Sequence, residues 1–565
     1  MAVATAPERK TNELLLQRLL ARHNRLKSEY SDQRSSHESI AAQMCPWRGR
    51  FTQKTRANKQ VTEQNAVYDS TAVRAHRGMG AFLMGGGSSP ARNWFRLKPP
   101  DPRLEEVYSV RAFFAEAARR MRFVMSRSNV YQALHNAYEE ISAFGTACVL
   151  MERNFDTVVH LHTLTVGSYF LATSPLGVVN CVYREFEMTV GQIVAEFGLE
   201  NVTQEIRHQY DEGMLETTHT VTHAVEPRED RLMDKLDQLN MRFRSVYFLQ
   251  GERRDNRTRG ILREGGYKTF PYLVPRWSVT DLNSWGSGPG HEVLPHAKRL
   301  QKMQFAMGEA VAFGAKPPLQ GPPGLTQKDI KLRPGGYTPV ANGANQKIES
   351  MFKVNLDVVA LSDQIERTQD QISRALYNDL FMLLMNSRRA KTATEVDEMH
   401  EEKMLMLGPA LERLHNELLR PLVERVFGYM EEAGLLPAVP SELQGVPLQV
   451  EFVSMLQQLQ QASGVVTLER FLSMVSAGGG AFPEMLDIVD ADNVARDYAD
   501  MLAIEPDNLR DPNDVAAIRQ ARAEAQSQQA QAEAQAVQAG AMRDVAAANR
   551  DAPDLAGAFQ GYGGI

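Results

Sequence analysis

Cysteine is scarce in this sequence, and the few that occur lie far apart. The 565 residues contain three cysteines, Cys45, Cys148 and Cys181, with no CxxC spacing among them. An odd count without paired spacing argues against both a disulfide framework and a structural zinc site. A reducing compartment is the simplest interpretation.

Long apolar runs and enzyme motifs are missing too. No stretch of about 18 apolar residues occurs, so the sequence predicts no membrane span. It contains neither the GxxxxGK[ST] loop that cradles phosphates nor the GxSxG turn that presents a nucleophilic serine. We therefore expect no catalytic residue and no cofactor.

Two groups of histidines partly resemble known metal-binding motifs. Residues 291–296 read HExxxH, one residue longer than the zinc motif, and Pro295 interrupts them. His160 and His162 alternate on a predicted strand and share a face, which is more typical of ordinary surface histidines than of metal ligands. We expect no metal site. The GMG and GGG glycines between residues 78 and 87 miss the GxGxxG spacing and predict a flexible loop.

Positive charge is concentrated locally rather than spread along the chain. The formal net charge is −6, so any contact with a polyanion must come from local patches. Two basic clusters stand out, and either could be an ordinary solvated surface. They are Arg48, Arg50, Lys54, Arg56 and Lys59 in the first, and Arg388, Arg389 and Lys391 in the second.

The first half of the chain mixes helices and strands. Leucines at helical spacing predict a helix around residues 16–30, and residues 104–145 are helical again. Residues 148–188 are rich in β-branched and aromatic side chains and predict three or four strands, with a turn at residues 174–177. Further elements are expected as a helix over 189–198, a helical stretch near 201–213, and strands over 217–225, 244–250 and 260–275.

Two long helices are predicted around a turn-rich tip. Residues 291–313 and 355–384 have helical patterns, the latter with an apolar stripe. Residues 316–347 between them are full of proline and glycine and cannot hold a core alone. Such a hairpin is typical of chains whose neighbouring copies pack side by side. The stripe consists of Leu361, Ile365, Ile372 and Leu376.

The second basic cluster lies between two predicted helices. Thr392 and Glu395 form a capping box, so a helix begins just after the cations. Gly408 and Pro409 predict a kink in that helix, and Pro421 a second bend. Beyond it we expect a strand over 441–453, short helices over 454–505, and an Ala/Gln-rich helix over 512–550 that is marginal alone.

Seven stretches stand out when taken in order. They are YDSTA (68–72), NWFRL (93–97), AFGTACVLME (143–152), PLGVVNCVYREFEMTVGQIVAEFG (175–198), FPYLVPRW (270–277), GSGPGHEVLP (286–295) and the segment from TATEVDEMHEEK to EEAGLLP (392–437). Together they resemble a known family, the portal proteins or head-to-tail connectors of short-tailed bacteriophages.

The resemblance implies an α+β, mainly helical portal fold with wing, stem, clip and crown, a C-terminal helical barrel, and assembly as a closed ring, usually of twelve subunits. The implied division is 1–45 N-terminal helical segment, 46–288 wing, 289–315 stem helix one, 316–354 clip, 355–384 stem helix two, 385–393 tunnel loop, 394–453 kinked long helix and return to the wing, 454–510 crown, 511–550 helical barrel and 551–565 disordered tail.

The resemblance also implies a function. Such a ring lies at one capsid vertex, passes double-stranded DNA during packaging and ejection, and docks the packaging ATPase (terminase) and then the tail adaptor proteins. Scaffolding and major capsid proteins are further implied partners, and no membrane is. The implied location is the virion, and the host cytoplasm during assembly. Arg388, Arg389 and Lys391 would line the channel and contact DNA without reading sequence.

Two other classes of function stay open at this point. A helical scaffold or adaptor protein of a viral assembly would share the absent catalytic motifs but would not hold DNA. An unrecognised nuclease or nucleotidyl enzyme would turn over DNA in the presence of Mg²⁺ or Mn²⁺.

Overall fold

The computed structural model describes most of the chain, which divides into two compact units. The described residues are 6–48, 50–51, 67–99, 101–105, 107–232, 234–235, 237–250, 260–315, 319–320, 349–350, 358–378, 408–443, 451–454, 468–477, 489–501, 510 and 512–551. Unit 1 comprises Met1–Arg96, Ala117–Pro437 and Phe452–Leu456, and unit 2 comprises Leu97–Glu116, Ala438–Glu451 and Gln457–Ile565.

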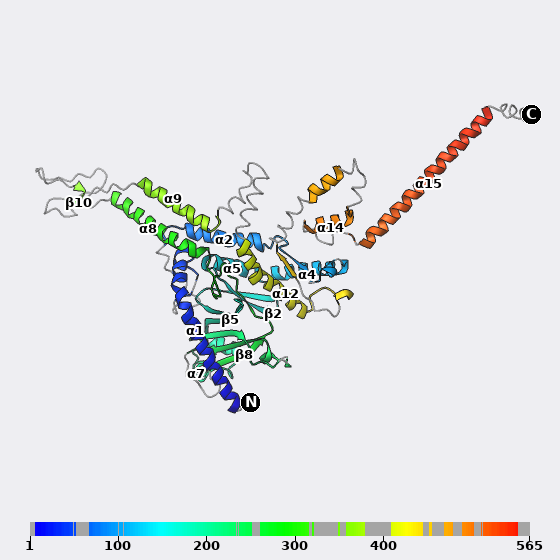
Figure 1. Cartoon of the computed structure of the whole chain (residues 1–565). Helices are drawn as coiled ribbons and strands as arrows, with labels where there is room; N and C mark the ends of the chain where they lie inside the picture. Colours follow the sequence, from blue (N-terminus) through cyan, green and yellow to red (C-terminus); the bar gives the residue numbers. More distant parts are fainter. Residues whose placement is uncertain are drawn as a thin grey trace, which may run out of the picture. The chain divides into compact units, whose positions relative to one another are not determined.

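Unit 1 combines helices with antiparallel strands, as predicted (Figure 1). Its helices are α1 (Ala6–Met44), α2 (Thr71–Gly87), α5 (Val130–Phe144), α6 (Val190–Phe197), α7 (Gln204–Asp211), α8 (Pro289–Ala315), α9 (Val358–Ala375) and α12 (Arg420–Glu432). Its strands are β2 (Cys148–Asn154), β3 (Val158–Leu164), β4 (Tyr169–Thr173), β5 (Val179–Thr189), β6 (Thr218–Pro227), β7 (Phe243–Leu249), β8 (Ile261–Tyr267), β9 (Tyr272–Leu273), β10 (Leu319–Gln320) and β11 (Glu349–Ser350).

Strands β4 to β8 form a five-stranded antiparallel sheet in chain order, and β3-β2-β9 form a three-stranded sheet. The four strands over 148–188, the turn at 174–177 and the later strands confirm the sequence predictions. In that turn Gly177 has a φ of 75° and its N–H donates to the carbonyl of Ser174, so the left-handed conformation explains the glycine.

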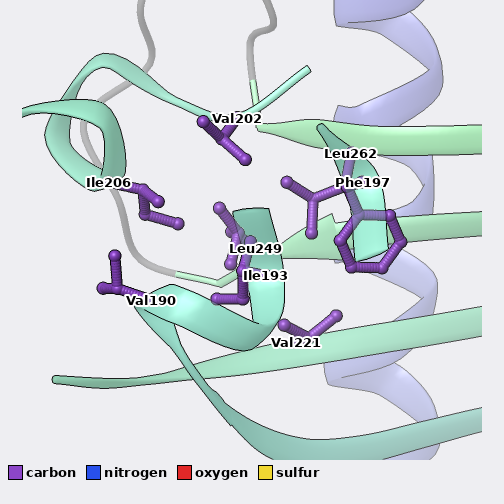
Figure 2. Close-up of a cluster of buried hydrophobic side chains, with 8 residues drawn as sticks. All are labelled: Val190, Ile193, Phe197, Val202, Ile206, Val221, Leu249 and Leu262. Atoms are coloured by element: carbon purple, nitrogen blue, oxygen red, sulfur yellow. The ribbon is translucent and has the colours of Figure 1, made fainter. Parts of the chain in front are cut away.

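One face of the five-stranded sheet is covered by α6 and α7. Figure 2 shows their apolar side chains pointing toward those of the sheet, and all are buried. Burying each such side chain contributes about 1.5–3 kcal/mol relative to exposure. The cluster consists of Val190, Ile193, Phe197, Val202, Ile206, Val221, Leu249 and Leu262.

Helix α1 packs on the opposite face of the same sheet and forms ion pairs with it. Side chains alternate along β6, so Glu226 points away from the face that Val221 shares with α6. Arg18 and Arg22 pair with the buried Glu226 at 2.6 and 3.1 Å. The stripe predicted on this helix, including the leucines and His23, is buried apart from a partly exposed Leu20.

Glu185 of β5 forms a second link to α1. Its Oε1 lies 2.7 Å from His23 Nε2 and accepts hydrogen bonds from Lys27 Nζ at 2.9 Å and Gln250 Nε2 at 3.0 Å. Burial raises the pKa of Glu185, but these partners outweigh burial and lower it to about 2. The carboxylate therefore stays ionised, and α1 is joined to the sheet by ionic contacts as well as apolar ones.

The predicted flexible loop over residues 78–87 is wrong, because these glycines lie inside α2. A Cβ at Gly80 would lie 2.8 Å from Glu139 Cγ on α5, and one at Gly78 would lie 2.8 Å from Asn378 Oδ1. The glycines therefore let α2 approach α5 and the segment after α9 more closely than larger residues allow.

Two predicted boundaries also need correction. The helix predicted over 355–384 ends at Ala375 and is followed by a turn in which Tyr377 has a φ of 57°; residues 379–384 lie outside the described residues. The predicted strand over 441–453 begins with a 3₁₀ turn at Ser441–Leu443, because the N–H of Leu443 bonds to the carbonyl of Pro440. Strand β12 is Glu451–Ser454, and residues 444–450 lie outside the described residues.

Further elements lie in other described parts of the chain. Strand β1 is Phe95–Lys98, α3 is Pro102–Glu105, α4 is Tyr108–Arg127, α14 is Ala491–Met501 and α15 is Pro512–Asp551. The last confirms the helix predicted in the Ala/Gln-rich segment, and its described side chains are exposed apart from a partly buried Val515. No helix in the described part of the chain is both long and apolar enough to cross a bilayer.

Candidate channel hairpin and its anchors

Helices α8 and α9 lie side by side and form the predicted hairpin (Figure 1). Their apolar residues, Ala297 and Leu300 on one helix and Ile365 and Ile372 on the other, are buried. Beyond them, β10 pairs antiparallel with β11, with Leu319 opposite Ser350. The ends of the proline- and glycine-rich tip are therefore brought together, as a compact tip between two helices requires.

A polar network ties the middles of the two helices to one carboxylate. Asp69 Oδ2 accepts hydrogen bonds from Gln304 Nε2 at 3.1 Å and from Gln369 Nε2 at 2.8 Å. Gln301 Oε1 accepts from the backbone N–H groups of Tyr68 and Asp69. Burial raises the pKa of Asp69, yet its hydrogen bonds lower it overall, so the ionised form is held in place.

The first turn of α8 is anchored by backbone-to-backbone packing against the end of α5. A Cβ at Gly288 would lie 2.6 Å from Gly145 Cα, and one at Gly290 would overlap the carbonyl of Ala143. Gly145 itself caps α5 with a φ of 70°. The sequence GSGPG is therefore the contact that fixes where the hairpin leaves the sheet domain, rather than a flexible linker.

Two adjacent residues hold the segments on either side of 379–407. The ring of Trp277 lies 6.1 Å from that of Tyr377, just after α9. Arg276 Nη2 lies 2.6 Å from Glu417 Oε1, and its backbone N–H donates to Glu417 Oε2 at 2.9 Å. The same guanidinium donates to the carbonyls of Asn283 and Gly177. One short stretch of chain thus anchors both flanks of the predicted tunnel loop.

Glu417 lies in a π-helical turn, His415–Leu419, directly before α12. Pro421 lacks an N–H and its ring would clash with the carbonyl of residue 417 in a regular α-helix. The N–H of Arg420 instead bonds to the carbonyl of His415, five residues back. The second bend predicted at Pro421 therefore takes the form of a π turn, which also aims Glu417 at Arg276.

The predicted loop cations cannot be placed. Arg388, Arg389, Lys391, Thr392 and Glu395 all lie outside the described residues. Gly408 and Pro409 are at the start of a described helical segment, but residues 401–407 are not described, so the kink stays a prediction.

The first basic cluster has a structural role where it is described. Arg48 pairs with Glu139 and with the buried Glu140, the latter at 3.2 Å. Burial raises the pKa of Glu140, and the guanidinium of Arg48 opposes that effect. The backbone N–H of Arg50 bonds to the carbonyl of Val166. Lys54, Arg56 and Lys59 lie outside the described residues.

The groups examined as metal motifs are explained by their surroundings. His160 and His162 do share a face of β3, with ring centroids 4.6 Å apart. His291 Nδ1 accepts a hydrogen bond from the N–H of Gly288, and burial lowers its pKa. Among the residues that the structure describes, no group of three or more histidine, cysteine or acidic side chains could hold a metal ion. The three cysteines are free and buried.

Sequence reasoning missed the anchoring residues Asp69, Arg276 and Glu417. Asp69 lies in the YDSTA stretch and Arg276 in FPYLVPRW, so the motifs that carried the resemblance contain them. Nothing in the local pattern shows that Glu417 is bonded rather than solvated.

Unit 1 thus joins a body of helices and sheets to an anchored two-helix hairpin, the arrangement that the resemblance implies. Comparison with known proteins gives the family. A family model described as "Bacteriophage head to tail connecting protein" matches residues 16–509. The chain is 42% identical over 550 residues to the "Probable portal protein" of Bordetella phage BPP-1, covering 96% of this chain and 98% of that protein. It is 34% identical over 512 residues to the "Portal protein" of Salmonella phage epsilon15, covering 90% and 91%.

The chain belongs to the bacteriophage head-to-tail connecting proteins, which confirms the predicted family. It is a portal-class connector and not a general scaffold.

Proposed function

We propose that copies of this chain close into a ring, of twelve subunits, at one capsid vertex, and that duplex DNA passes through its central channel during packaging and ejection. The observation that carries the proposal is the α8–α9 hairpin. In this head-to-tail connector the outer surface of the hairpin exposes large apolar side chains to solvent. Phe305, Phe313 and Val359 are 46%, 48% and 72% exposed. A hairpin with buried inner contacts and apolar outer contacts suits head-to-tail packing of copies around an axis.

In this ring, residues 1–45 are an N-terminal helical segment and residues 46–288 are the wing. Residues 289–315 and 355–384 are the two stem helices, and residues 316–354 are the clip. The clip binds the packaging ATPase (terminase) and later the tail adaptors. The antiparallel β10–β11 pair at its base supports a compact docking element. Residues 385–393 are the tunnel loop, 394–453 the kinked helix and return to the wing, 454–510 the crown and 551–565 the tail. Scaffolding and major capsid proteins surround the ring.

Residues 511–550 form a helical barrel of parallel copies in this proposal. A helix in a closed barrel touches two neighbours, so it needs small residues on two opposite faces. Residues two apart lie about 200° apart on a helix, and alanines repeat at that step in α15. One face carries Ala521, Ala525, Ala532, Ala536 and Ala539, and the other Ala523, Ala530, Ala534 and Ala541.

Imaging the purified protein down its axis tests the ring. We expect closed rings of about twelve copies with a central hole that admits a duplex, and native mass spectrometry should give the same copy number. A stable monomer or dimer at every concentration contradicts the proposal, and a ring without such a hole favours an adaptor that does not hold DNA.

Replacing Arg388, Arg389 and Lys391 together with serine tests the channel contact. Each copy contributes three cations, so the ring should lose sequence-independent phosphate contacts and hold packaged DNA less well, with rings still assembling. The measurement is the fraction of packaged DNA that filled particles release on dilution into low-magnesium buffer, at several salt concentrations. A triple variant that packages and retains DNA normally places these cations away from the channel.

A further inference from the structure

The outer side of α8 carries positive charge. Residues two apart on a helix lie about 200° apart, so Lys298 and Lys302 lie opposite the buried Leu300. Arg299 is exposed beside them. Within the described part of the chain, none of these three cations forms an ion pair or a side-chain hydrogen bond. We call Lys298, Arg299 and Lys302 the cationic face.

The outer side of α9 carries negative charge in the same way. Asp363 and Asp370 lie two residues before the buried Ile365 and Ile372, so they point away from the buried stripe. Glu366 is exposed between them, and none of the three carboxylates pairs with a cation among the described residues. We call Asp363, Glu366 and Asp370 the acidic face.

The two faces lie at similar heights along the hairpin. Gln304 and Gln369 both donate to Asp69 Oδ2, so the two helices are level at these residues. A helix rises about 1.5 Å per residue, and Lys302 and Asp370 therefore lie within about 3 Å of that level. Because the two charges are on the outer sides of different helices, they are placed to meet a neighbouring copy rather than each other.

Apolar side chains follow the charges in the same order on both helices. Toward the tip, α8 exposes Phe305 and Phe313, and α9 exposes Val359. The ring of Tyr68 lies 5.3 Å from that of Phe305 and extends this exposed surface. Two copies side by side at one height would therefore match opposite charges and also match apolar with apolar. An open groove of about 510 Å³ lies along the cationic face, and its other lining residues are Pro295, Met303, Ala306 and Leu361.

We propose that the cationic face of one copy binds the acidic face of the next copy around the ring. Each interface then sets three cations against three carboxylates, and the exposed Glu309 and Arg367 nearer the tip are again of opposite sign. DNA would suit the cationic face but would be repelled by the equally exposed acidic one, so the pair of faces favours a second copy. The inference rests on the proposed function, because it takes the copies to surround an axis.

Charge reversal tests this contact in protein freed of nucleic acid. One variant reverses the cationic face and the other reverses the acidic face, so each alone presents two faces of the same sign. We expect the fraction of rings in native mass spectrometry to fall at least about tenfold at low salt for each variant, because like charges repel at every interface. The substitutions are Lys298→Glu, Arg299→Glu and Lys302→Glu in the first variant, and Asp363→Lys, Glu366→Lys and Asp370→Lys in the second.

The two variants act as controls for one another. In a mixture, opposite signs meet at every contact only when the two variants alternate, so rings should return with equal numbers of each. A chain that carries all six substitutions restores opposite signs within one sequence and should form rings as the wild type does. Neither rescue would follow if the substitutions acted by unfolding the hairpin.

Three results would overturn the proposal while leaving the ring itself in place. The first is normal assembly of both variants, and the second is a loss that neither mixing nor the six-substitution chain restores. The third is a reversed cationic face that assembles normally but retains packaged DNA poorly, which would assign these cations to the channel. If the wild type forms no ring but its copies associate with the same loss and rescue, only the proposed function fails. A wild type that stays monomeric at every concentration refutes both.

Discussion

Replacing Gly290 with alanine is expected to destabilise unit 1 by about 3 kcal/mol or more. The added Cβ would overlap the backbone of Ala143, which cannot rotate away as a side chain could. Ala143 is in the last turn of α5, and Gly145 follows it in the left-handed conformation, so relief would require moving the helix end or the start of α8. Both movements would displace the hairpin from the body.

The matched control is the same substitution on the same helix at Gly308. A Cβ there meets nothing within 4 Å. Alanine is a better helix former than glycine by about 0.5–1 kcal/mol, so Gly308→Ala should be neutral or slightly stabilising. All four tryptophans, at positions 47, 94, 277 and 285, belong to unit 1, so tryptophan fluorescence during denaturation reports this unit alone. Equal midpoints for the two variants would show that the close backbone contact is not what fixes the hairpin.

The spacing of apolar residues predicted most helices and strands, because each face of such an element lies in a single kind of surroundings. The strands of the five-stranded sheet, β4 to β8, alternate between an α1 face and an α6 face, and the hairpin helices carry one buried stripe each. In the structure a local cap also marks the start of α6, since Thr189 and Gln192 form a capping box.

The errors occurred where distant residues decide the local structure. The glycines of α2 read as a loop because the reason for them, the close approach of Glu139 and Asn378, comes from other parts of the chain. The turn after α9 carries Tyr377, whose ring lies against Trp277 from a distant part of the sequence, and local periodicity does not reveal such a contact. Arg48 was counted as part of a basic patch, yet its two glutamate partners lie on α5. A cation count cannot distinguish a surface patch from a buried ion pair.

The same limitation applies to the site. Charge spacing predicted a cationic loop over 385–393, which lies outside the described residues. It did not predict that both flanks of this loop would meet at Arg276 and Trp277. Anchors of this kind consist of single residues without a repeating pattern, so only a folded chain reveals them.

Removing the Arg276 side chain should be the most costly change at this anchor. Arg276→Met leaves Glu417 without its guanidinium partner and leaves the carbonyls of Asn283 and Gly177 without their donor. The Arg276 side chain is 3% exposed, and breaking a buried pair on one side typically costs about 3–5 kcal/mol. Glu417→Gln should cost less, because the amide oxygen still accepts the backbone N–H of Arg276. Arg413, 3.6 Å from Glu417, provides some compensation for the lost arginine.

A double-mutant cycle on unit 1 measures the coupling directly. Arg276→Met combined with Glu417→Leu removes both charges, so the double variant should be more stable than the sum of the single changes predicts, by up to about 3 kcal/mol. The control pair is Arg263 with Glu196, which lies at 2.9 Å but is 47% and 52% exposed. Solvent screens such a pair, and its coupling should stay below about 1 kcal/mol. Similar coupling energies in both cycles would mean that burial does not strengthen the contact between Arg276 and Glu417. The π turn would then have to be held in place by the packing of Leu418 and Leu419 alone.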